Sequence, residues 1–586
     1  MTSSDDAADA TDTADTPNDV EVLTEAALSW LDQDPDPETR DELGALLRRV
    51  GANLPGAADE LRSRFGSRLE FGTAGLRGEL AAGPNRMNRV LVGQAAAGLA
   101  AYLLEHAHPD APPSVVIGYD GRKNSRVFAV DTAELMAGAG VRAVLLPRLL
   151  PTPLVAFAVR DLGVSAGVMV TASHNPPRDN GYKVYLGGAD DGSQIVPPAD
   201  GEIAAHILRV AAERDLRELP RSEAYEVAGD DVVERYVAAT AAVAAVRAHP
   251  EPLVAETGLS VVYTAMHGVG WETFARVLDR AGFERPVLVT EQIEPDPDFP
   301  TVAFPNPEEP GALDLALAAA RAAGADLVVA NDPDADRLAI AIPDPSRDEG
   351  YRALTGNEVG QLLGWRAAEA AVAAEAAASS TLACSIVSSP GLGAVAEAYG
   401  LGFTETLTGF KWVSRASGLV FGYEEALGYL VNPATVRDKD GISAAVAFLD
   451  LARSLAAEGR TIADRLHEFA ERFGHYGSAQ ISLRVTDLSQ IGRVMQRLRS
   501  DPPAEVAGLR VLGIDDLSRG DGGVPASDVL RLRFDGARVM VRPSGTEPKL
   551  KIYLDAWSRE GSVAERRDAV VEALARLEGG MRDRIA

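Results

Sequence analysis

Three carboxylates stand at alternate positions in the segment Asp332-Pro333-Asp334-Ala335-Asp336, directly after an apolar run. Clustered carboxylates repel one another unless a cation neutralises them, and Mg²⁺ prefers hard oxygen ligands of this kind. An EF-hand is excluded, because the sixth position of the loop is Arg337 rather than Gly and the twelfth is Pro343 rather than Glu. A solvated acidic turn is the alternative, but the preceding apolar run and the following Arg337 favour a metal site.

A serine that could carry a phosphoryl group lies where another apolar run ends, in Thr171-Ala172-Ser173-His174-Asn175-Pro176. The segment contains no Gly-x-Ser-x-Gly elbow, which disfavours the catalytic triad of a hydrolase. Taken alone, Ser173 is better explained as a turn or capping residue than as a nucleophile. It becomes a candidate only in the company of other motifs.

Cations gather with hydroxyls and glycine in the segment Arg542–Lys549, with Lys551 beyond it. The hydroxyls of Ser544 and Thr546, the backbone amides around Gly545 and a forked guanidinium suit a phosphate dianion. A basic surface turn is the alternative, and it is less easily accepted on so acidic a chain.

Weaker signals of the same chemistry occur elsewhere. The segment Phe71–Gly78 combines glycines, Thr73 and Arg77, but it has neither GxGxxG nor Walker spacing, so mononucleotide binding is unsupported. Other turns offer cations, and two adjacent glutamates are able to accept hydrogen bonds from vicinal hydroxyls. These residues lie in Thr408-Gly409-Phe410-Lys411, Arg437–Gly441 (with Lys439) and Glu424-Glu425. Each is weak alone, since a solvated turn is the more common meaning.

A repeated unit positions these motifs. Each copy opens with an apolar strand, continues with a helix whose apolar residues recur at i, i+3, i+4 and i+7 in the last two copies, and leads toward a second strand, which predicts parallel pairing. The copies open at Val115, Ser260 and Thr381. A further apolar strand with a polar tip follows each copy, at Gly167–Val170, Leu327–Ala330 and Leu419–Phe421. Because ligands of open α/β sheets sit beyond strand ends, we expect the three tips to converge on one cleft.

Composition narrows the class of protein. The 586 residues include 57 Lys and Arg against 86 Asp and Glu, a net charge of -29. This balance argues against nucleic acid and anionic membranes as partners. With one cysteine, no apolar run near the ~20 residues of a membrane span and no signal-peptide pattern, we expect a cytoplasmic protein.

The expected organisation has four domains after an acidic tail. The connector Glu202–Val227 and the Pro/Asp/Gly-rich stretch Asp344–Gly350 interrupt the repeated units. The last segment alternates strands and helices differently, as a smaller α+β domain. The expected ranges are a disordered tail at 1–20 and domains at 21–220, 221–347, 348–462 and 463–586.

Together these motifs resemble the α-D-phosphohexomutase superfamily, which includes phosphoglucomutases and phosphomannomutases. From about residue 40 to the C-terminus, every signature appears in family order. The resemblance implies an α/β fold of four domains around a central cleft, three of them similar α/β units with mixed sheets and the fourth a smaller α+β domain. The similar segments are Thr171–Pro176 (phosphoserine loop), Asp332–Arg337 (Mg²⁺ loop), Tyr423–Gly428 (sugar-specificity loop) and Arg542–Thr546 (phosphate-binding loop).

The resemblance also implies a mechanism and its cofactors. Phosphorylated Ser173 would give its phosphoryl group to a sugar monophosphate, glucose 1-phosphate first, and then take back the other group from the bisphosphate formed. Mg²⁺ would bind Ser173, Asp332, Asp334 and Asp336, and glucose 1,6-bisphosphate would act as activator.

Roles for the remaining residues follow from the same resemblance. His174, Lys183 and Lys439 are implied in proton transfer or local electrostatics, and Arg337 in charge stabilisation or substrate contact. A lysine that acts as a base needs a lowered pKa, which we expect clustered cations to supply. Substrate contacts are implied for Arg77, Thr408, Gly409, Lys411, Glu424, Arg542, Ser544, Gly545, Thr546 and Lys551.

One departure leaves the sugar open. The common sugar loop has Ser where this chain has Ala426, which cannot donate a hydrogen bond to the substrate. The variant is more similar to the branch that holds phosphopentomutases and glucose-1,6-bisphosphate synthases. Mannose and pentose phosphates therefore stay as alternative substrates. The alternative functions are a bisphosphate synthase and a non-catalytic phosphosugar sensor. We expect a monomer or a small homo-oligomer.

Overall fold

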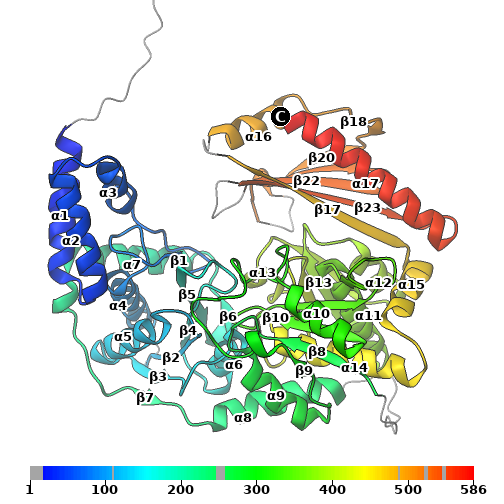
Figure 1. Cartoon of the computed structure of the whole chain (residues 1–586), viewed down its shortest axis with the longest axis horizontal. Coiled ribbons are helices and arrows are strands. Elements are labelled where there is room, and N and C mark those ends of the chain that lie inside the picture. Colours follow the sequence, from blue (N-terminus) through cyan, green and yellow to red (C-terminus); the bar gives the residue numbers. More distant parts are fainter. Residues whose placement is uncertain are drawn as a thin grey trace, which may run out of the picture.

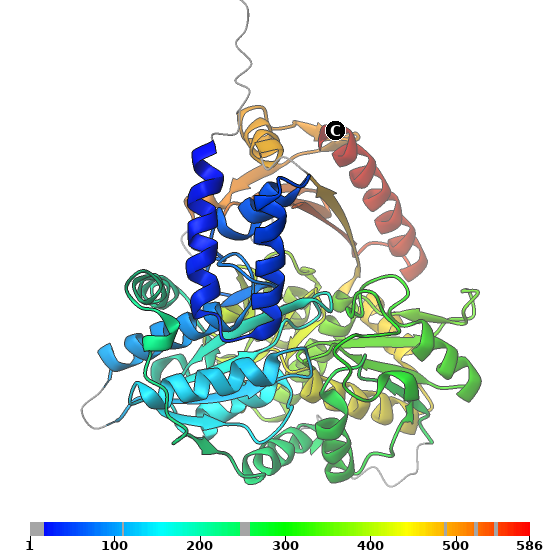
Figure 2. The same ribbon diagram turned by 60° about the vertical axis from the view of Figure 1, so that its left-hand side comes forward.

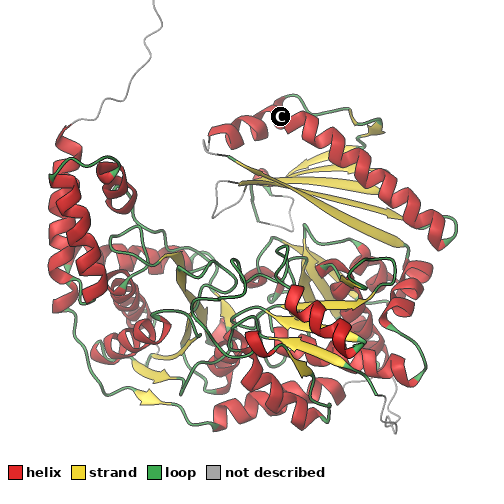
Figure 3. Ribbon diagram, in the orientation of Figure 1, coloured by secondary structure: helices red, strands yellow, loops and turns green. Residues whose placement is uncertain are grey.

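The computed structural model describes residues 17–107, 111–245, 258–485, 489–520, 525–543 and 549–585. Four large sheets, each accompanied by helices, form four units in chain order (Figure 3). The C-terminal unit lies above the third unit, and three N-terminal helices stand at the outer edge of the first (Figure 1). The architecture confirms the α/β class with mixed sheets and a different last unit.

The first unit is a sheet of mixed direction with the strand order β1-β5-β4-β2-β3-β7. Its helices α4 and α7 pack together, as do α4 and α5. The side chain of Asn88 starts α4 by accepting a hydrogen bond from Leu91 N at 3.0 Å, which satisfies one free amide of the first turn. Its elements are β1 (Leu76–Glu79), α4 (Arg89–Glu105), β2 (Ser114–Tyr119), α5 (Ser125–Gly138), β3 (Arg142–Leu145), α6 (Thr152–Asp161), β4 (Ala166–Val170), β5 (Asp179–Leu186), β6 (Ser193–Gln194), α7 (Ala199–Glu213) and β7 (Glu226–Val227).

The second unit repeats the core of the first. Its strand order is β12-β11-β10-β8-β9, with β8 parallel to β9 and β10, and β10 antiparallel to β11. Every residue of β10 is buried, as the continuous apolar run predicts for a central strand. Its elements are α8 (Asp231–Ala241), β8 (Val261–Thr264), α9 (Gly270–Ala281), β9 (Val287–Leu288), α10 (Asp314–Ala323), β10 (Leu327–Asn331), β11 (Leu338–Pro343) and β12 (Tyr351–Ala353).

The third unit has the same four-strand pattern, in the order β14-β13-β15-β16. Thr355 and Glu358 form a reciprocal capping box at the start of α11. Its elements are α11 (Gly356–Ala373), β13 (Thr381–Ser385), α12 (Gly391–Tyr399), β14 (Gly402–Thr406), α13 (Phe410–Val413), β15 (Leu419–Glu424), β16 (Gly428–Leu430), α14 (Gly441–Ala457) and α15 (Ile462–Phe473).

The repetition fixes where the polar loops lie. In each unit the third strand of the pattern turns back antiparallel into the fourth, as β4–β5, β10–β11 and β15–β16. The polar segments after Val170, Asn331 and Glu424 are the tips of these three hairpins. The predicted strand–helix–strand repeats and the equivalent positions of their loops are confirmed.

The second and third units are joined directly at two of these tips. Leu338 N donates to Leu427 O at 3.1 Å, and Arg337 forms a backbone bridge with Gly428. One buried apolar cluster runs through both units and into the first, from Leu154 through Val329 to Phe421. The hairpin tips therefore sit on a shared core rather than on separate domains free to drift.

The C-terminal unit is an antiparallel sheet in the order β17-β23-β22-β21-β20, with its own apolar core under α16 and α17. A smaller apolar cluster, which includes Ile386 and Met540, joins it to the third unit. Its elements are β17 (His475–Arg484), α16 (Ser489–Ser500), β18 (Glu505–Val506), β19 (Leu509–Arg510), β20 (Gly513–Asp516), β21 (Leu530–Phe534), β22 (Ala537–Pro543), β23 (Lys549–Ser558) and α17 (Val563–Ile585).

Three expectations about segments need correction. Helix α1 (Pro17–Gln33) begins inside the expected tail, because residues 17–20 are helical, while residues 1–16 lie outside the described part. Helix α1 packs beside α2 (Pro37–Gly51) and near α3 (Ala57–Phe65), where Trp30 and Leu43 are buried (Figure 2).

The other two corrections concern connectors. The stretch Asp344–Gly350 is not an interdomain linker but the turn of the β11–β12 hairpin, so β12 completes the second sheet beyond the boundary expected at residue 347. The segment Glu202–Val227 contributes α7 and the edge strand β7 to the first unit. Among the described helices, none combines the length and apolar character that crossing a membrane needs.

Candidate active site

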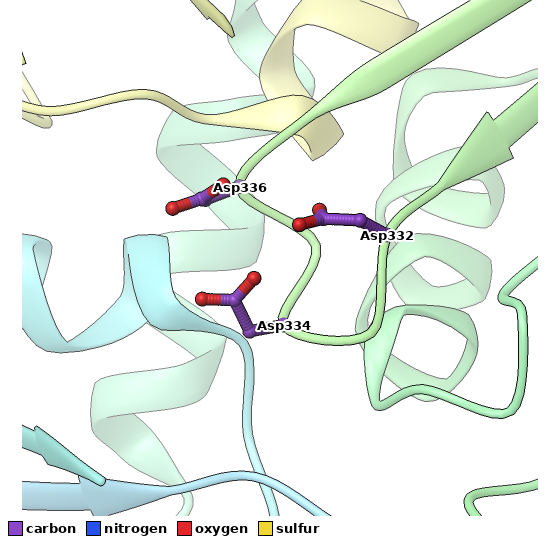
Figure 4. Close-up of side chains that lie close together, drawn as sticks. All are labelled: Asp332, Asp334 and Asp336. Carbon is purple, nitrogen blue, oxygen red and sulfur yellow. The ribbon is translucent and has the colours of Figure 1, made fainter. Parts of the chain in front are cut away.

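The three aspartates of the second hairpin tip form one buried cluster. Oxygen atoms of Asp332, Asp334 and Asp336 lie within 4.8 Å of one another, and Figure 4 shows the side chains converging from a single loop. The loop turns sharply at Ala335, which has a left-handed φ of 55° and donates from its backbone N to Asp332 O at 2.9 Å. Arg337 N closes the turn on Asp332 Oδ1 at 3.0 Å.

Cations from two other units face this cluster. Lys183, on β5, donates from Nζ to Asp334 Oδ2 and Asp336 Oδ2, both at 2.8 Å. Lys439, from the third unit, lies with Nζ 3.3 Å from Asp336 Oδ2. Thr152, at the start of α6, adds a hydrogen bond from Oγ1 to Asp334 Oδ2 at 2.6 Å.

The aspartates differ in how they bear their charge. Burial raises the pKa of Asp332 well above its ordinary value, and the neighbouring carboxylates Asp334 and Asp336 raise it further. Burial acts in the same direction on Asp336, but Lys183 and Lys439 outweigh it and hold the pKa of Asp336 well below its ordinary value. Asp332 therefore lacks enough positive charge nearby to stabilise its ionised carboxylate.

The expected lowering of the lysine pKa values is wrong for both Lys183 and Lys439. Burial alone would lower the pKa of each, but the surrounding carboxylates, Asp334 and Asp336 for Lys183 and Asp336 for Lys439, outweigh it and raise the pKa. The cations do cluster as expected, yet the carboxylates act on the pKa of each lysine more strongly than the other cations do. Burial lowers the pKa of a third lysine, Lys411, which is the direction a base requires.

The donor set fits a hard divalent cation. Oδ1 of Asp334 and Oδ1 of Asp336 are buried and accept no hydrogen bond from the part of the chain that the structure describes. Buried carboxylate oxygens without a donor are costly unless an ion or water binds them. Three converging carboxylates of this kind are ligands suited to Mg²⁺.

Ser173 of the first unit reaches the same cluster. Its Oγ donates to Asp332 Oδ2 at 3.0 Å and lies 3.1 Å from His174 Nδ1. Burial, with Arg337 and Arg77 nearby, lowers the pKa of His174 well below its ordinary value, so the imidazole is neutral. A hydroxyl, a neutral imidazole and a candidate metal site thus meet at one point.

The third hairpin tip brings a glutamate to the site. Glu424 is buried, and its Oε1 accepts a hydrogen bond from Gly409 N at 2.6 Å. Gly409 has a φ of 119°, a conformation that only glycine adopts freely. Burial and the adjacent Glu425 raise the pKa of Glu424. Arg337 reaches across from the metal loop and donates from Nη1 to Ala426 O at 2.8 Å.

Two more cations, Lys411 and Arg542, lie with two threonines at the junction of three units. Thr73 of the first, Thr408 and Lys411 of the third and Arg542 of the C-terminal unit line a cavity of about 190 Å³. Lys411 Nζ contacts Thr73 Oγ1 directly. The structure therefore places Thr408, Lys411 and Arg542, three residues for which the resemblance implies substrate contacts, around one cavity.

The other predicted substrate residues are placed as follows. Lys551 lies opposite Arg542 in the register of β22 and β23. Arg77, on β1, donates from Nη1 to Asn175 Oδ1 at 3.1 Å and so borders the serine loop. Ser544, Gly545 and Thr546 lie outside the described residues.

Comparison with known families decides the membership of the chain. Models of the phosphoglucomutase/phosphomannomutase α/β/α domains I, II and III match residues 68–214, 234–345 and 355–473, and the model of the C-terminal domain matches residues 482–573. The chain belongs to the phosphoglucomutase/phosphomannomutase family. As a member of this family it is a phosphosugar mutase, an isomerase that moves a phosphoryl group within its substrate.

Relatives carry several sugar names. The chain is 53% identical to the "Probable phosphomannomutase" of Haemophilus influenzae, over 85% of this chain and 97% of that protein. It is 34% identical to the phosphopentomutase of Homo sapiens, over 92% of each chain. The fold matches a phosphoglucomutase/phosphomannomutase family protein from Burkholderia thailandensis with a TM-score of 0.66 at 20% identity, covering 89% of this chain and 97% of that one.

Two polar residues of this mutase site escaped sequence reasoning. Thr152 gave no signal, because its partner Asp334 is far away in the sequence. Asp438 stood in a segment noted only for its cations, yet it is buried and accepts hydrogen bonds from Tyr185 Oη at 2.9 Å and Gln194 Nε2 at 2.7 Å. Asp438 thereby fastens the loop of Lys439 to the first unit.

Proposed function

We propose that this mutase interconverts a hexose 1-phosphate and a hexose 6-phosphate, glucose phosphate first, with Ser173 as its phosphoryl carrier. The observation that carries the proposal is the contact of Ser173 Oγ with Asp332 Oδ2 at 3.0 Å, between loops of two different units. It places a hydroxyl that can be phosphorylated beside the carboxylates that fit a metal. A structural serine has no need of a buried carboxylate triad.

Asp332, Asp334 and Asp336 would hold Mg²⁺, together with an oxygen of the phosphoserine. The bound ion would neutralise charge on the phosphoryl group in transfer. Lys183 and Lys439, kept cationic by the carboxylates, would stabilise the same charge. Arg337 holds the loop of Glu424 against the loop of Asp332, so both move as one piece.

The first transfer breaks the bond between phosphorus and Ser173 Oγ and forms one to a sugar hydroxyl oxygen. The proton lost by that hydroxyl ends on Ser173 Oγ. Neutral His174, with Nδ1 at 3.1 Å from Oγ, is placed to pass this proton on. The return transfer starts from the other end of the sugar bisphosphate, such as glucose 1,6-bisphosphate: it breaks the bond from phosphorus to that sugar oxygen and forms one to Ser173 Oγ. The proton of Ser173 Oγ then ends on the sugar oxygen that is released.

The cavity formed by Thr408, Lys411 and Arg542 would bind the phosphate that does not react. Its cations suit a dianion, and its walls come from three units, so it can adapt to either orientation of the substrate. Glu424 is connected to this cavity through Gly409, the neighbour of Thr408, whose backbone N donates to Glu424 Oε1. Its carboxylate would accept hydrogen bonds from sugar hydroxyls.

A pentose 1-phosphate is the second candidate substrate. Ala426 supplies no hydroxyl to the sugar, and the similarity to the human phosphopentomutase covers nearly the whole chain. A smaller sugar needs fewer hydrogen-bond donors on the sugar loop.

Initial rates on glucose, mannose and ribose 1-phosphates, with Mg²⁺ and the matching bisphosphate, test the proposal. We expect kcat/KM to favour glucose 1-phosphate at least tenfold, which corresponds to about 1.4 kcal/mol of differential transition-state binding. A preference for mannose or ribose would overturn the sugar assignment alone. If the Ser173→Ala variant retained most of its activity, the proposed role of Ser173 as phosphoryl carrier would be wrong.

A further inference from the structure

A buried arginine that no motif singled out lies behind the serine loop. Arg122 follows β2 on the turn that starts at Asp120, and only 4% of its surface is exposed. Its backbone N donates to Asp120 Oδ1 at 3.0 Å, and Asp120 Oδ2 lies 3.6 Å from its Nε. It contacts neither Asp332 nor the phosphate cavity in any hydrogen bond of the described residues.

The guanidinium of Arg122 binds the serine loop through four backbone carbonyls. Nη2 donates to Ser173 O and Asn175 O, both at 2.6 Å. Nη1 donates to Pro176 O at 2.8 Å and Asp179 O at 3.1 Å. A planar fork reaches four acceptors at once, which the single ammonium of a lysine, with three donors, does not.

These bonds hold Ser173 in an unfavourable conformation. Ser173 has a left-handed φ of 53°, which is sterically strained for a residue with a side chain. Thr171 Oγ1 accepts a hydrogen bond from Ser173 N at 2.8 Å, and Arg122 takes the carbonyl on the other side. The backbone N and O of Ser173 are thus both held by hydrogen bonds, and the backbone does not continue as an extended strand. In this conformation Ser173 Oγ faces Asp332.

The second unit seals this arrangement. The ring of Phe299 lies over the Arg122 guanidinium, 4.9 Å from Cζ to the ring centre. The turn and the second unit are in such close contact that a Cβ on Gly121 would come within 2.9 Å of Pro295 Cβ. The hydrogen bond to Ser173 O is buried, and a hydrogen bond in such a site is stronger than in solvent.

We propose that Arg122 is the positioning residue for the phosphoryl carrier: it fixes the backbone of Ser173 so that Oγ meets the metal loop of the second unit. The inference rests on the proposed role of Ser173. Arg122 acts through the backbone and does not touch the substrate. Its loss therefore lowers kcat in both directions and leaves binding of the sugar phosphate nearly intact.

Arg122→Lys tests this role, because lysine keeps the charge and cannot serve four carbonyls. The matched control is Arg465→Lys. Arg465 is another buried arginine, which lies in α15 and donates to Glu369 of α11 and to Glu468 of its own helix. We expect R122K to lower kcat about a hundredfold, the scale of a misplacement near 1 Å, with KM within about threefold. Hydrogen exchange should accelerate in residues 171–181 and not in the third unit, and R465K should show neither effect.

Phe299→Leu is a second variant, which keeps Arg122 but removes the aromatic ring that lies over its guanidinium. We expect faster exchange of the same loop and a smaller fall in kcat. Wild-type kcat and unchanged exchange of the loop in R122K would overturn the proposal, and so would a rise in KM without a fall in kcat. If the wild-type protein phosphorylates no serine and isomerises no sugar phosphate, the proposed function fails instead, while the exchange data still report whether Arg122 holds the loop.

Discussion

Arg337 donates a hydrogen bond from Nη1 to the backbone carbonyl of Ala426 at 2.8 Å. The metal loop and the sugar loop are therefore tied through the backbone of the residue that departs from the common family pattern. The contact does not depend on which side chain residue 426 carries. We therefore expect a substitution at position 426 to alter the proposed recognition of sugar without loosening the metal loop.

Ala426→Ser tests this separation. We expect the melting temperature to change little, because the backbone contact is kept and the added hydroxyl is small. The new donor should raise kcat/KM for hexose phosphates relative to ribose 1-phosphate by several-fold, up to the tenfold that about 1.4 kcal/mol supplies. Rates on the three sugar 1-phosphates measure it, and an equal change for all three would contradict the idea that this position reads the sugar.

Replacing Asp336 and replacing Asp332 should have different effects on the stability of the protein but similar effects on its activity. Asp336→Asn removes the carboxylate that faces two buried lysines, so we expect a loss of about 3–5 kcal/mol, typical of a broken buried ion pair. Asp332→Asn removes a carboxylate whose pKa burial and like charges raise, so the metal-free protein should keep or gain stability. Both variants should lose most activity and Mg²⁺ affinity.

Thermal unfolding with EDTA and with Mg²⁺, alongside calorimetric Mg²⁺ titration, separates these effects. The stabilisation of the wild-type protein by Mg²⁺ should shrink in both variants. An Asp332→Asn protein as unstable as Asp336→Asn in EDTA would show that the two carboxylates carry their charge alike.

Asp440 should make stability depend on pH. Burial raises its pKa from 3.8 to about 6, although it caps α14 by accepting from Ile442 N and Ser443 N. Below pH 3.8 the carboxyl is protonated in both the folded and the unfolded chain. Between pH 3.8 and 6 the unfolded chain ionises first, so folding free energy is lost through this window and the loss persists above it.

Asp440→Asn isolates this effect. The amide keeps an acceptor for the cap and does not ionise, so its stability relative to the wild type should rise between pH 4 and pH 7, by up to about 3 kcal/mol. Denaturant unfolding of both proteins across this range measures the difference. A difference that is flat with pH would mean that Asp440 stays ionised at little cost.

The repeated units and their loops were predictable because each rests on a local pattern: an apolar run long enough for a buried strand, then polar residues at its end. That pattern places Ser173, Asp332 and Glu424 at strand ends, but the roles proposed for Ser173 and Glu424 came from the family resemblance. Arg122 and Thr152 do not, since their contacts reach loops about 50 and 180 residues away. The pKa directions of Lys183 and Lys439 also depend on which charges the fold brings closest, and spacing along the chain does not reveal this.

Arg538 should control how the C-terminal unit docks on the third. It lies on β22, the strand that leads to Arg542, and is buried with Nη1 at 2.7 Å from Glu405 Oε1 and Nε at 2.8 Å from Asp555 Oδ2. It also binds the carbonyl of Ser388, whose hydroxyl donates to Glu425 Oε2 at 3.0 Å. One guanidinium thus links the strand that leads to the cavity residue Arg542 with the segment Tyr423–Gly428.

Arg538→Met should lower kcat/KM at least about tenfold, mainly by raising KM, because Arg542 no longer faces Lys411 in a fixed geometry. Glu405 and Asp555 would each lose one of their hydrogen-bonded partners, so the melting temperature should fall as well. Arg533→Met is the control, since this arginine lies on the neighbouring strand with its side chain 57% exposed beside Asp515. Small-angle scattering should show a more open Arg538→Met protein. An unchanged KM and scattering profile would mean that the apolar cluster around Met540 suffices to dock the unit.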